Sequence, residues 1–423
     1  MLTILTIGVV VFVGLVTLFQ ASYTAIYHRF IQQGLKERRG DSSDEQSHVA
    51  VILCLRGIDP ALKHCLSSLA AQSRQNWSLH LVFDHESDPA ITPARNWCND
   101  LALQPVVHFV EHSAFSAGTL KCHALVTAID RIHEESEFIA LIDADSIVDQ
   151  HWLRDLLAPF SDPSVGATTG NRWFEPETGS NGSLVRQIWS AAAVVQMYIY
   201  NIAWGGSLVV RSSAIGKCKL LQKWSTAFCE DTMLSSELKK HGYRLQRIPD
   251  VIALNRETTS LHDAFRWISR QLLTVRLHHA GWPMVLIHGI SIGLCLVAVP
   301  ALLVAAIVVQ QWSLVWVLLG TAAFFPIANS LIIKVINSAN RAVVLERFEN
   351  ESSQSPAGPV TYFMAIMLTQ FIQPVAALIT AVASRATWRG IEYSIKKGSV
   401  QMAEYLPYKQ AQPDDDSGRE SVF

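Results

Sequence analysis

The sequence has few features of a secreted, zinc-binding or nucleic-acid-binding protein. Its seven cysteines are an odd number without a CxxC pair. They fit neither a disulfide framework nor a zinc site, and they indicate a reducing compartment. The formal net charge is only −2, so we predict no nucleic-acid partner. No basic residues precede the first apolar stretch and no clear cleavage site follows it, which argues against the alternative of a signal peptide.

Apolar residues are what the chain has in excess. They make up 50% of the 423 residues, which fits one soluble domain plus a few membrane spans. Residues 2–25 are apolar, uncharged and long enough to cross a bilayer. Arg29, Lys36, Arg38 and Arg39 follow them. Because basic flanks stay inside, we predict an integral protein of the cell (inner) membrane whose soluble domain is cytoplasmic.

Three more apolar stretches, 284–309, 314–335 and 360–383, are each long enough to span. Three crossings after a cytoplasmic domain would leave the C-terminus outside, although Arg385, Arg389, Lys396 and Lys397 flank the last stretch. One stretch is therefore a candidate for a re-entrant segment. The last is the suspect, because it contains Gln370, Gln373 and Pro374.

Between the first and second apolar stretches, short apolar runs alternate with helical patterns. We expect strands at Val49–Leu55, 79–83, 106–110, Phe138–Ile142 and 243–248, and helices at 60–72, 119–133, 184–200 and 232–241. Strands that alternate with helices of this length indicate βαβ units. The predicted fold class is therefore α/β with a mostly parallel sheet, plus N-terminal and C-terminal transmembrane helices.

The chemistry centres on the run Phe138–Ile142 and the two aspartates, Asp143 and Asp145, that follow it. An unbroken apolar run predicts a strand buried on both faces, and residues i and i+2 of a strand point the same way. Two carboxylates at the carboxyl end of such a strand suit Mg²⁺ or Mn²⁺ bound to a phosphate. The alternative is a pair of solvated loop acids.

Three other groups are candidates, each with a plain alternative. Asp84 ends the second predicted strand and can accept hydrogen bonds from a base or ribose, or is a turn aspartate. Lys121 lies in a first helical turn, where phosphates bind, or is merely solvated. The acids Glu230 and Asp231 precede a helix and offer a general base, or only cap that helix.

Residues 259–282 combine apolar positions at helical spacing with arginines and histidines. This pattern predicts an amphipathic helix at the membrane surface. An ordinary core-facing helix is the alternative.

Together these residues resemble the membrane-bound family 2 glycosyltransferases, especially the ceramide glucosyltransferases and the hopanoid-associated bacterial glycosyltransferases. The resemblance covers nearly the whole chain and includes residues 388–393 after the last apolar stretch. It implies a GT-A-type (Rossmann-like) domain that uses a UDP-sugar donor. It also implies roles for single residues: uracil binding by Asp84, donor contact by Lys121, metal binding by Asp143 and Asp145, catalytic base by Asp231 beside Glu230, and acceptor contact by Gly205 and Gly206.

One motif departs from the family. Members usually carry (Gln/Arg)xxArgTrp before the membrane, and the closest match here is the segment 270–276, without the Arg-Trp pair. This departure disfavours a processive synthase. It leaves Arg270, Gln271 and Arg276 as uncertain phosphate or acceptor ligands.

The expected organisation is a transmembrane helix (1–27), a linker (28–47), a GT-A domain (48–258), an amphipathic interfacial helix (259–282), about three transmembrane helices (283–385), and an interfacial segment with a disordered tail (386–423). The expected activity is inverting, metal-dependent transfer of a hexose, glucose or N-acetylglucosamine, from a UDP-sugar to a lipid hydroxyl. The acceptor is ceramide-, hopanoid- or diacylglycerol-like, and the reaction is at the cytoplasmic face. The alternatives are a processive polysaccharide synthase and a non-catalytic membrane scaffold.

Overall fold

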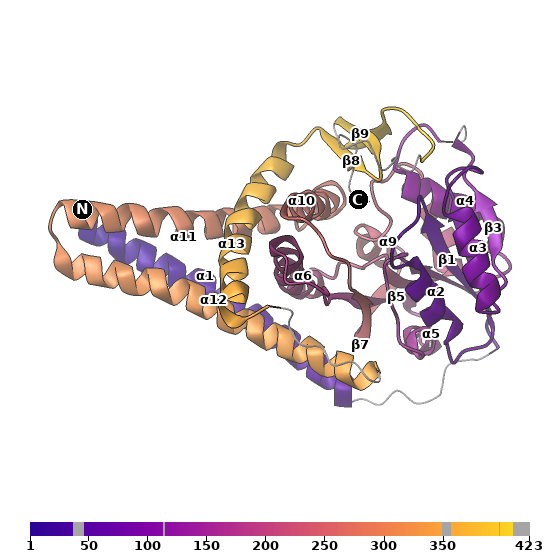
Figure 1. Ribbon diagram of the computed structural model, residues 1–423, viewed down its shortest axis with the longest axis horizontal. Helices are drawn as coiled ribbons and strands as arrows, with labels where there is room; N and C mark the ends of the chain where they lie inside the picture. Colours follow the sequence, from indigo (N-terminus) through magenta and orange to yellow (C-terminus); the bar gives the residue numbers. More distant parts are fainter. Residues whose placement is uncertain (37–45, 113–114, 349–356, 397, 409–423) are drawn as a thin grey trace.

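A seven-stranded sheet forms the centre of the domain that follows the first helix (Figure 1). The computed structural model describes residues 1–36, 46–112, 115–348, 357–396 and 398–408. The strand order is β3-β2-β1-β4-β6-β5-β7. The strands are β1 (Val49–Leu55), β2 (Trp77–Phe83), β3 (Val106–Phe109), β4 (Phe138–Ile142), β5 (Val165–Phe174), β6 (Ser207–Arg211) and β7 (Arg244–Asn255).

The predicted fold class is confirmed. The pairs β1–β2, β1–β4, β2–β3 and β5–β7 are parallel, and only β6 runs antiparallel to its neighbours. This is the mostly parallel sheet expected of a GT-A-type domain. The predicted bounds of β1 and β4 agree with the structure, whereas β5 was missed and β7 is longer than expected.

Helices cover both faces of the sheet, which explains why β4 is buried along its whole length. One apolar core joins the strands to α2, α3 and α5, and a second joins them to α4, α7, α8 and α9. These helices are α2 (Leu62–Ala70), α3 (Ile91–Asp100), α4 (Leu120–Ile132), α5 (Trp152–Leu157), with the short 3₁₀ turn η2 (Ala158–Ser161), α7 (Ser212–Lys217), α8 (Leu220–Trp224) and α9 (Leu234–Lys240).

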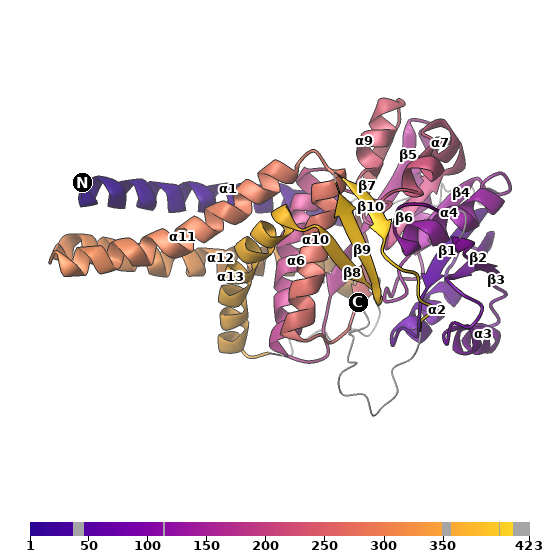
Figure 2. The same ribbon diagram turned by 90° about the horizontal axis from the view of Figure 1, so that it is seen from above.

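Within the described residues, four helices are long and apolar enough to cross a membrane: α1 (Leu2–Lys36), α11 (Trp282–Val308), α12 (Trp312–Arg347) and α13 (Pro359–Val382). Three of them, α1, α11 and α12, extend together away from the sheet domain (Figures 1 and 2). In both views α13 instead crosses these three at a steep angle. Helix α1 continues to Lys36, so the predicted linker 28–47 is helical in its first part. Residues 37–45 lie outside the described residues.

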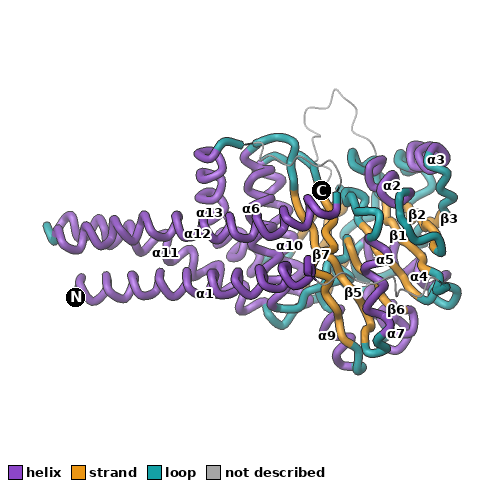
Figure 3. Tube along the Cα trace, turned by 90° about the horizontal axis from the view of Figure 1, so that it is seen from below, coloured by secondary structure: helices purple, strands orange, loops and turns teal. Residues whose placement is uncertain are grey.

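Two helices separate the sheet from α13: α6 (Asn181–Ile199) and α10 (Leu261–His278) (Figure 3). Helix α10 lies within the region predicted as an amphipathic interfacial helix. It packs against α6 and α13, and it buries Trp267, Ile268, Leu272 and Leu273. Helix α10 therefore lies between the sheet and α13 and packs against its neighbours.

The segment after α13 differs from its predicted form. Residues 386–423 were expected to be an interfacial segment and a disordered tail, but β8 (Arg385–Trp388), β9 (Ile391–Lys396) and β10 (Ser399–Met402) form an antiparallel sheet. This sheet packs on the main domain, since the Gly118 amide donates to the Val400 carbonyl at 2.9 Å. The Leu120 amide likewise donates to the Tyr393 hydroxyl at 3.2 Å. The tail predicted to be disordered, from Gln410, lies outside the described residues.

Candidate functional site

Polar side chains gather at one edge of the sheet because of its topology. The strands β1, β2 and β4 are parallel, so their carboxyl ends meet at this edge, where open α/β sheets bind ligands. The residues that follow these three ends are Arg56, Asp84 and Asp143. Strand β6 is antiparallel to β4, so it begins at the same edge and brings Gly205 and Gly206 there.

This edge opens into a cavity, here called the polar cavity. It brings together most of the predicted site residues: Asp84, Lys121, Asp143, Asp145, Glu230, Asp231, Arg270 and Gln271 all line it. Arg276 does not line the cavity. Its guanidinium donates to the carbonyls of Thr380 and Ala383, the latter at 2.7 Å, and so closes the C-terminal end of α13.

The two aspartates of the predicted metal site lie in a turn, because β4 ends at Ile142. A turn, rather than strand alternation, thus brings both carboxylates to the polar cavity. Asn255 donates its amide to Asp145 Oδ2 at 2.7 Å. Burial, together with the nearby charges of Asp143, Asp59 and Glu257, raises the pKa of Asp145 to about 7. This excess of negative charge is what a bound divalent cation would neutralise, so the residues fit such an ion.

Lys121 connects two of the acids. Its Nζ lies 2.8 Å from Asp143 Oδ1 and 2.9 Å from Glu230 Oε1. It stands in the first turn of α4, whose N-cap Thr119 accepts a hydrogen bond from the Cys122 amide. Burial raises the pKa of the Glu230 carboxyl, although the charge of Lys121 opposes this effect. Lys121 is therefore not merely solvated, because it joins the buried carboxylate of Glu230 to the half-buried one of Asp143.

Asp231 does not cap the helix that follows it. Helix α9 begins at Leu234, and its N-cap Met233 has no side-chain cap. The Asp231 carboxylate instead accepts the Gly205 amide at 2.8 Å and the Thr232 hydroxyl at 2.9 Å. These donors fix the carboxylate at the cavity wall, as a positioned proton acceptor requires.

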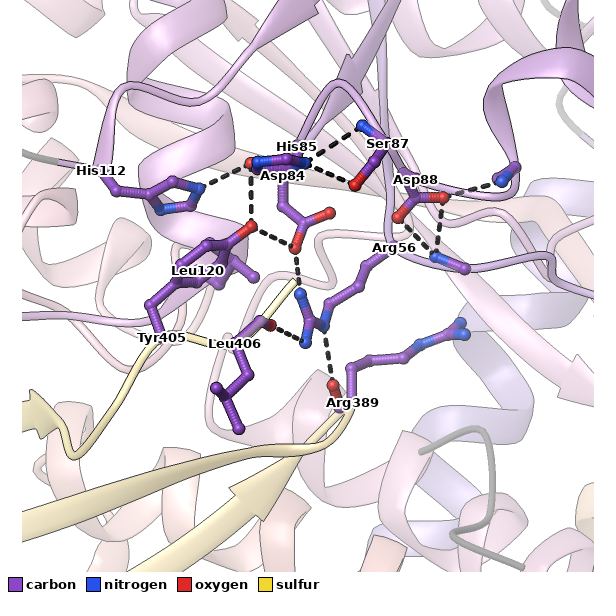
Figure 4. Close-up of polar contacts among 12 residues, drawn as sticks. Arg56, Asp84, His85, Ser87, Asp88, His112, Leu120, Arg389, Tyr405 and Leu406 are labelled. Atoms are coloured by element: carbon purple, nitrogen blue, oxygen red, sulfur yellow. Dashed lines mark hydrogen bonds and ion pairs between the residues drawn. The ribbon is translucent and has the colours of Figure 1, made fainter. Parts of the chain in front are cut away.

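Asp84 also lines the polar cavity, and Figure 4 shows the contacts around it. Its carboxylate pairs with Arg56 and accepts the Tyr405 hydroxyl at 3.2 Å. Its Oδ1 atom is buried and has no hydrogen-bond partner among the described residues. Its backbone carbonyl accepts from His112, whose ring stacks on Tyr405 at 3.7 Å. Asp84 thus keeps one acceptor atom available beside two aromatic rings.

A second cavity, here called the apolar cavity, lies between α6, α10 and the membrane-type helices, which are α1, α11, α12 and α13. Leucine, isoleucine, valine and aromatic side chains form much of its wall, together with neutral polar groups such as Gln20, Gln196 and Asn329. The two cavities share the residues Arg172, Trp204, Asp231, Gln271 and Thr274. Asp231 lies on this shared wall, whereas Glu230 lines the polar cavity alone.

Several residues of the polar cavity were not predicted from the sequence, including Arg56, Arg172, Asn255 and Arg389. Two of them had a readable signal. Arg56 follows β1, and Asn255 is the last residue of β7, so the same strand-end rule that found Asp84 and Asp143 applies to them. Arg172 within β5 and Arg389 far along the chain had no such signal.

Comparisons with known proteins give similar solved structures and one family. No curated protein matches the chain. The mannosyltransferase PcManGT from Pyrobaculum calidifontis, solved with GDP-Man and Mn²⁺, is 18% identical over 88% of this chain and 99% of that one, with a TM-score of 0.46. A TarS fragment from S. aureus, solved with UDP-GlcNAc, is 13% identical over 84% and 99%, with a TM-score of 0.35. The family description "Glycosyl transferase family 21" matches residues 9–401, and the chain therefore belongs to this family of enzymes, which transfer a sugar from a nucleotide-sugar.

Proposed function

We propose that the protein is an inverting, metal-dependent hexosyltransferase that moves glucose or N-acetylglucosamine from a UDP-sugar to a hydroxyl of a membrane lipid at the cytoplasmic face. One observation carries the proposal: Asp231 lines both the polar and the apolar cavity. A carboxylate at this junction can contact the acceptor hydroxyl from one side while the donor sugar approaches from the other.

The donor occupies the polar cavity in this proposal. The free acceptor atom of Asp84 receives an N–H of the uracil, and the neighbouring rings of His112 and Tyr405 supply apolar surface. Asp143 and Asp145 hold Mg²⁺ or Mn²⁺, which when bound offsets negative charge on the diphosphate. Lys121 keeps Asp143 in position through the 2.8 Å ion pair.

The acceptor occupies the apolar cavity. Apart from Arg172 and Asp231 on the shared wall, its lining has no Asp, Glu, Lys or Arg. Apolar walls between α1, α6 and α11 suit lipid chains, and their polar end leads toward Asp231. A lipid acceptor also explains why a sugar-nucleotide domain is attached to membrane-type helices.

The transfer step follows from these positions. Asp231 accepts the proton of the lipid hydroxyl as its oxygen attacks the anomeric carbon. The bond from that carbon to the β-phosphate oxygen breaks, and its electron pair leaves with UDP. Because attack and departure occur on opposite faces of the carbon, the anomeric configuration inverts. The Gly205 amide and the Thr232 hydroxyl hold the carboxylate in place.

The orientation follows from chain connectivity. The sheet β8–β10 packs on the main domain, so both lie on the same side of the membrane. Helices α11 and α12 cross the membrane twice and so return the chain to the side of the main domain. A further crossing by α13 would place β8–β10 on the opposite side, so α13 does not cross. This arrangement would account for the excess crossing expected from the sequence. The basic flank of α1, with Arg29 and Lys36, assigns that side to the cytoplasm.

The test separates chemistry from binding. Asp231→Asn keeps size and most hydrogen bonding but removes the proton acceptor. Turnover from radiolabelled UDP-sugar to membrane lipid should fall by roughly 10²- to 10⁴-fold, while UDP affinity changes only a few fold.

Glu230→Gln is the matched neighbour, since Glu230 does not line the apolar cavity. It should lose less turnover than Asp231→Asn. Near wild-type turnover of Asp231→Asn would remove Asp231 from the mechanism. A larger loss of turnover in Glu230→Gln than in Asp231→Asn would mean that Glu230, and not Asp231, is the base.

A further inference from the structure

The tip of the C-terminal hairpin enters the polar cavity. Strands β8 and β9 are joined by Arg389 and Gly390, which both have positive φ, at 49° and 74°. This tight turn carries Trp388 and Arg389 into the cavity lining, across from Arg270 of α10. The cavity is therefore closed by an element that lies more than 200 residues after β4 in the sequence.

Arg389 is fixed by two hydrogen bonds, but one of its guanidinium donors has no partner among the described residues. Its Nη2 donates to Asp59 Oδ2 at 2.8 Å, and its backbone carbonyl accepts from Arg56 Nε at 2.8 Å (Figure 4). Its Nη1 is buried without a hydrogen-bond partner among the described residues. Leaving a buried charged donor unpaired is costly, so this atom has the environment of a ligand contact.

Arg270 has the same feature. Its guanidinium lies over the Trp388 ring, 4.7 Å from the ring centroid, and its Nη1 is also buried without a partner in the described parts of the chain. Two guanidinium groups thus line one cavity, each with an unused donor. Two like charges kept together away from water repel each other, and an anion that accepts from both unused donors would offset this repulsion.

We propose that Arg389 and Arg270 form a two-arginine clamp for the diphosphate of the nucleotide-sugar, with Arg389 supplied by the C-terminal hairpin. Guanidinium groups match phosphoryl oxygens with paired N–H donors. Both residues line the polar cavity and neither lines the apolar cavity, so the ligand is the diphosphate of the donor rather than a group of the acceptor. The clamp also stabilises the charge that the leaving diphosphate gains. This proposal rests on the donor site of the proposed function.

The experiment compares ligands with and without phosphate. UDP and uridine binding are measured on the purified full-length protein with Mn²⁺ present. Arg389→Gln and Arg270→Gln should each weaken UDP binding by about 10- to 100-fold, the usual worth of a charged hydrogen bond, while uridine binding stays within about two fold. Arg385→Gln is the matched control, because Arg385 begins the same sheet and forms an exposed pair with Glu392. It should leave both affinities unchanged.

Two results would overturn the clamp. Unchanged UDP binding in Arg389→Gln removes its diphosphate contact. Equal losses for UDP and uridine mean that Arg389 only holds the hairpin through Asp59 and Arg56. Failure of the wild type to bind UDP would count against the uridine donor instead, and the same comparison with GDP and guanosine then tests the clamp. Binding of neither diphosphate would overturn both proposals.

Discussion

At the scale of single residues, the site requires two positions without side chains. A Cβ on Gly205 would lie 2.0 Å from Glu230 Oε1, and a Cβ on Gly206 would lie 2.5 Å from Asp143 Oδ2 and 2.3 Å from the Trp204 ring. Real Cβ contacts are not this short, so the carboxylates occupy the space that a side chain would need. Only glycine lets the start of β6 approach the acids so closely.

Gly206→Ala should therefore displace Asp143 and lower turnover by about 10²-fold, the usual effect of moving a reacting group by about 1 Å. Overpacking against Trp204 should also lower the melting temperature by a few degrees. Gly216→Ala in α7 is the control, since nothing lies within 4 Å of its added Cβ. Measured turnover of Gly206→Ala equal to that of Gly216→Ala would contradict this account.

Residue-scale prediction from the sequence depended on strand ends. A buried apolar run followed by acids was enough to find Asp84, Asp143 and Asp145. The sequence could not predict that Lys121 would join Asp143 to Glu230, because that contact spans three separate segments. The resemblance included residues 388–393, but it did not place Arg389 in the site, since the path of the chain after α13 depends on packing and not on local pattern.

At the scale of elements, long apolar strands and helices were predicted well and polar buried ones were not. Strand β5 was missed although all ten of its residues are buried. It contains Gly166, Thr168, Asn171 and Arg172, and such a run has neither the alternation nor the apolar character that marks a strand. Tertiary contacts of these polar groups override the local signal.

One cation of α12 joins this helix to three acids of the main domain. Arg347, in the last turn of α12, pairs with Asp155 and Asp250 and lies 3.6 Å from Asp149. Arg347→Met would leave these buried carboxylates without that charge, which typically costs about 3–5 kcal/mol. The melting temperature should fall by about 10 °C in detergent. Arg341→Met, at an exposed position of the same helix, should change it little. Equal shifts in both variants would mean that the cluster does not stabilise the contact.

Strands β2 and β3 join through a buried histidine pair, with His80 Nδ1 3.0 Å from His108 Nε2. Burial, together with the neighbouring His108, lowers the pKa of His80 to about 4. Between pH 6.5 and about 4 the unfolded chain binds a proton that folded His80 does not, so stability falls with decreasing pH in this window. His80→Asn should show a shallower loss of melting temperature from pH 7 to 5, by about 2–4 °C at pH 5. Parallel curves for the two proteins would contradict this assignment.

At the scale of the whole molecule, the number of membrane crossings that we predict depends on how α13 packs against its neighbours. In the most apolar 18-residue stretch of α13, 50% of the residues are buried, whereas the corresponding share in α1, α11 and α12 is 22–28%. Figures 1 and 2 show α13 across the other three rather than alongside them. Length and composition alone could not separate α13 from a span, because both properties satisfy the requirement for crossing. Its packing against α10, which α1, α11 and α12 do not share to the same extent, is the basis on which we predict that it does not cross.

We predict that only α1, α11 and α12 cross the membrane, which cysteine labelling can test. The native thiols give little background, since all but Cys54 are buried. Single cysteines replace three exposed residues: Gln311 between α11 and α12, Lys63 in α2, and Ser399 in β10. A membrane-impermeant maleimide added to intact cells should label only the Gln311→Cys variant, and all three should react after permeabilisation. Labelling of Ser399→Cys from outside would mean that α13 crosses, which is incompatible with β8–β10 packed on a cytoplasmic domain. Labelling of Lys63→Cys from outside would instead reverse the orientation and refute a cytoplasmic reaction.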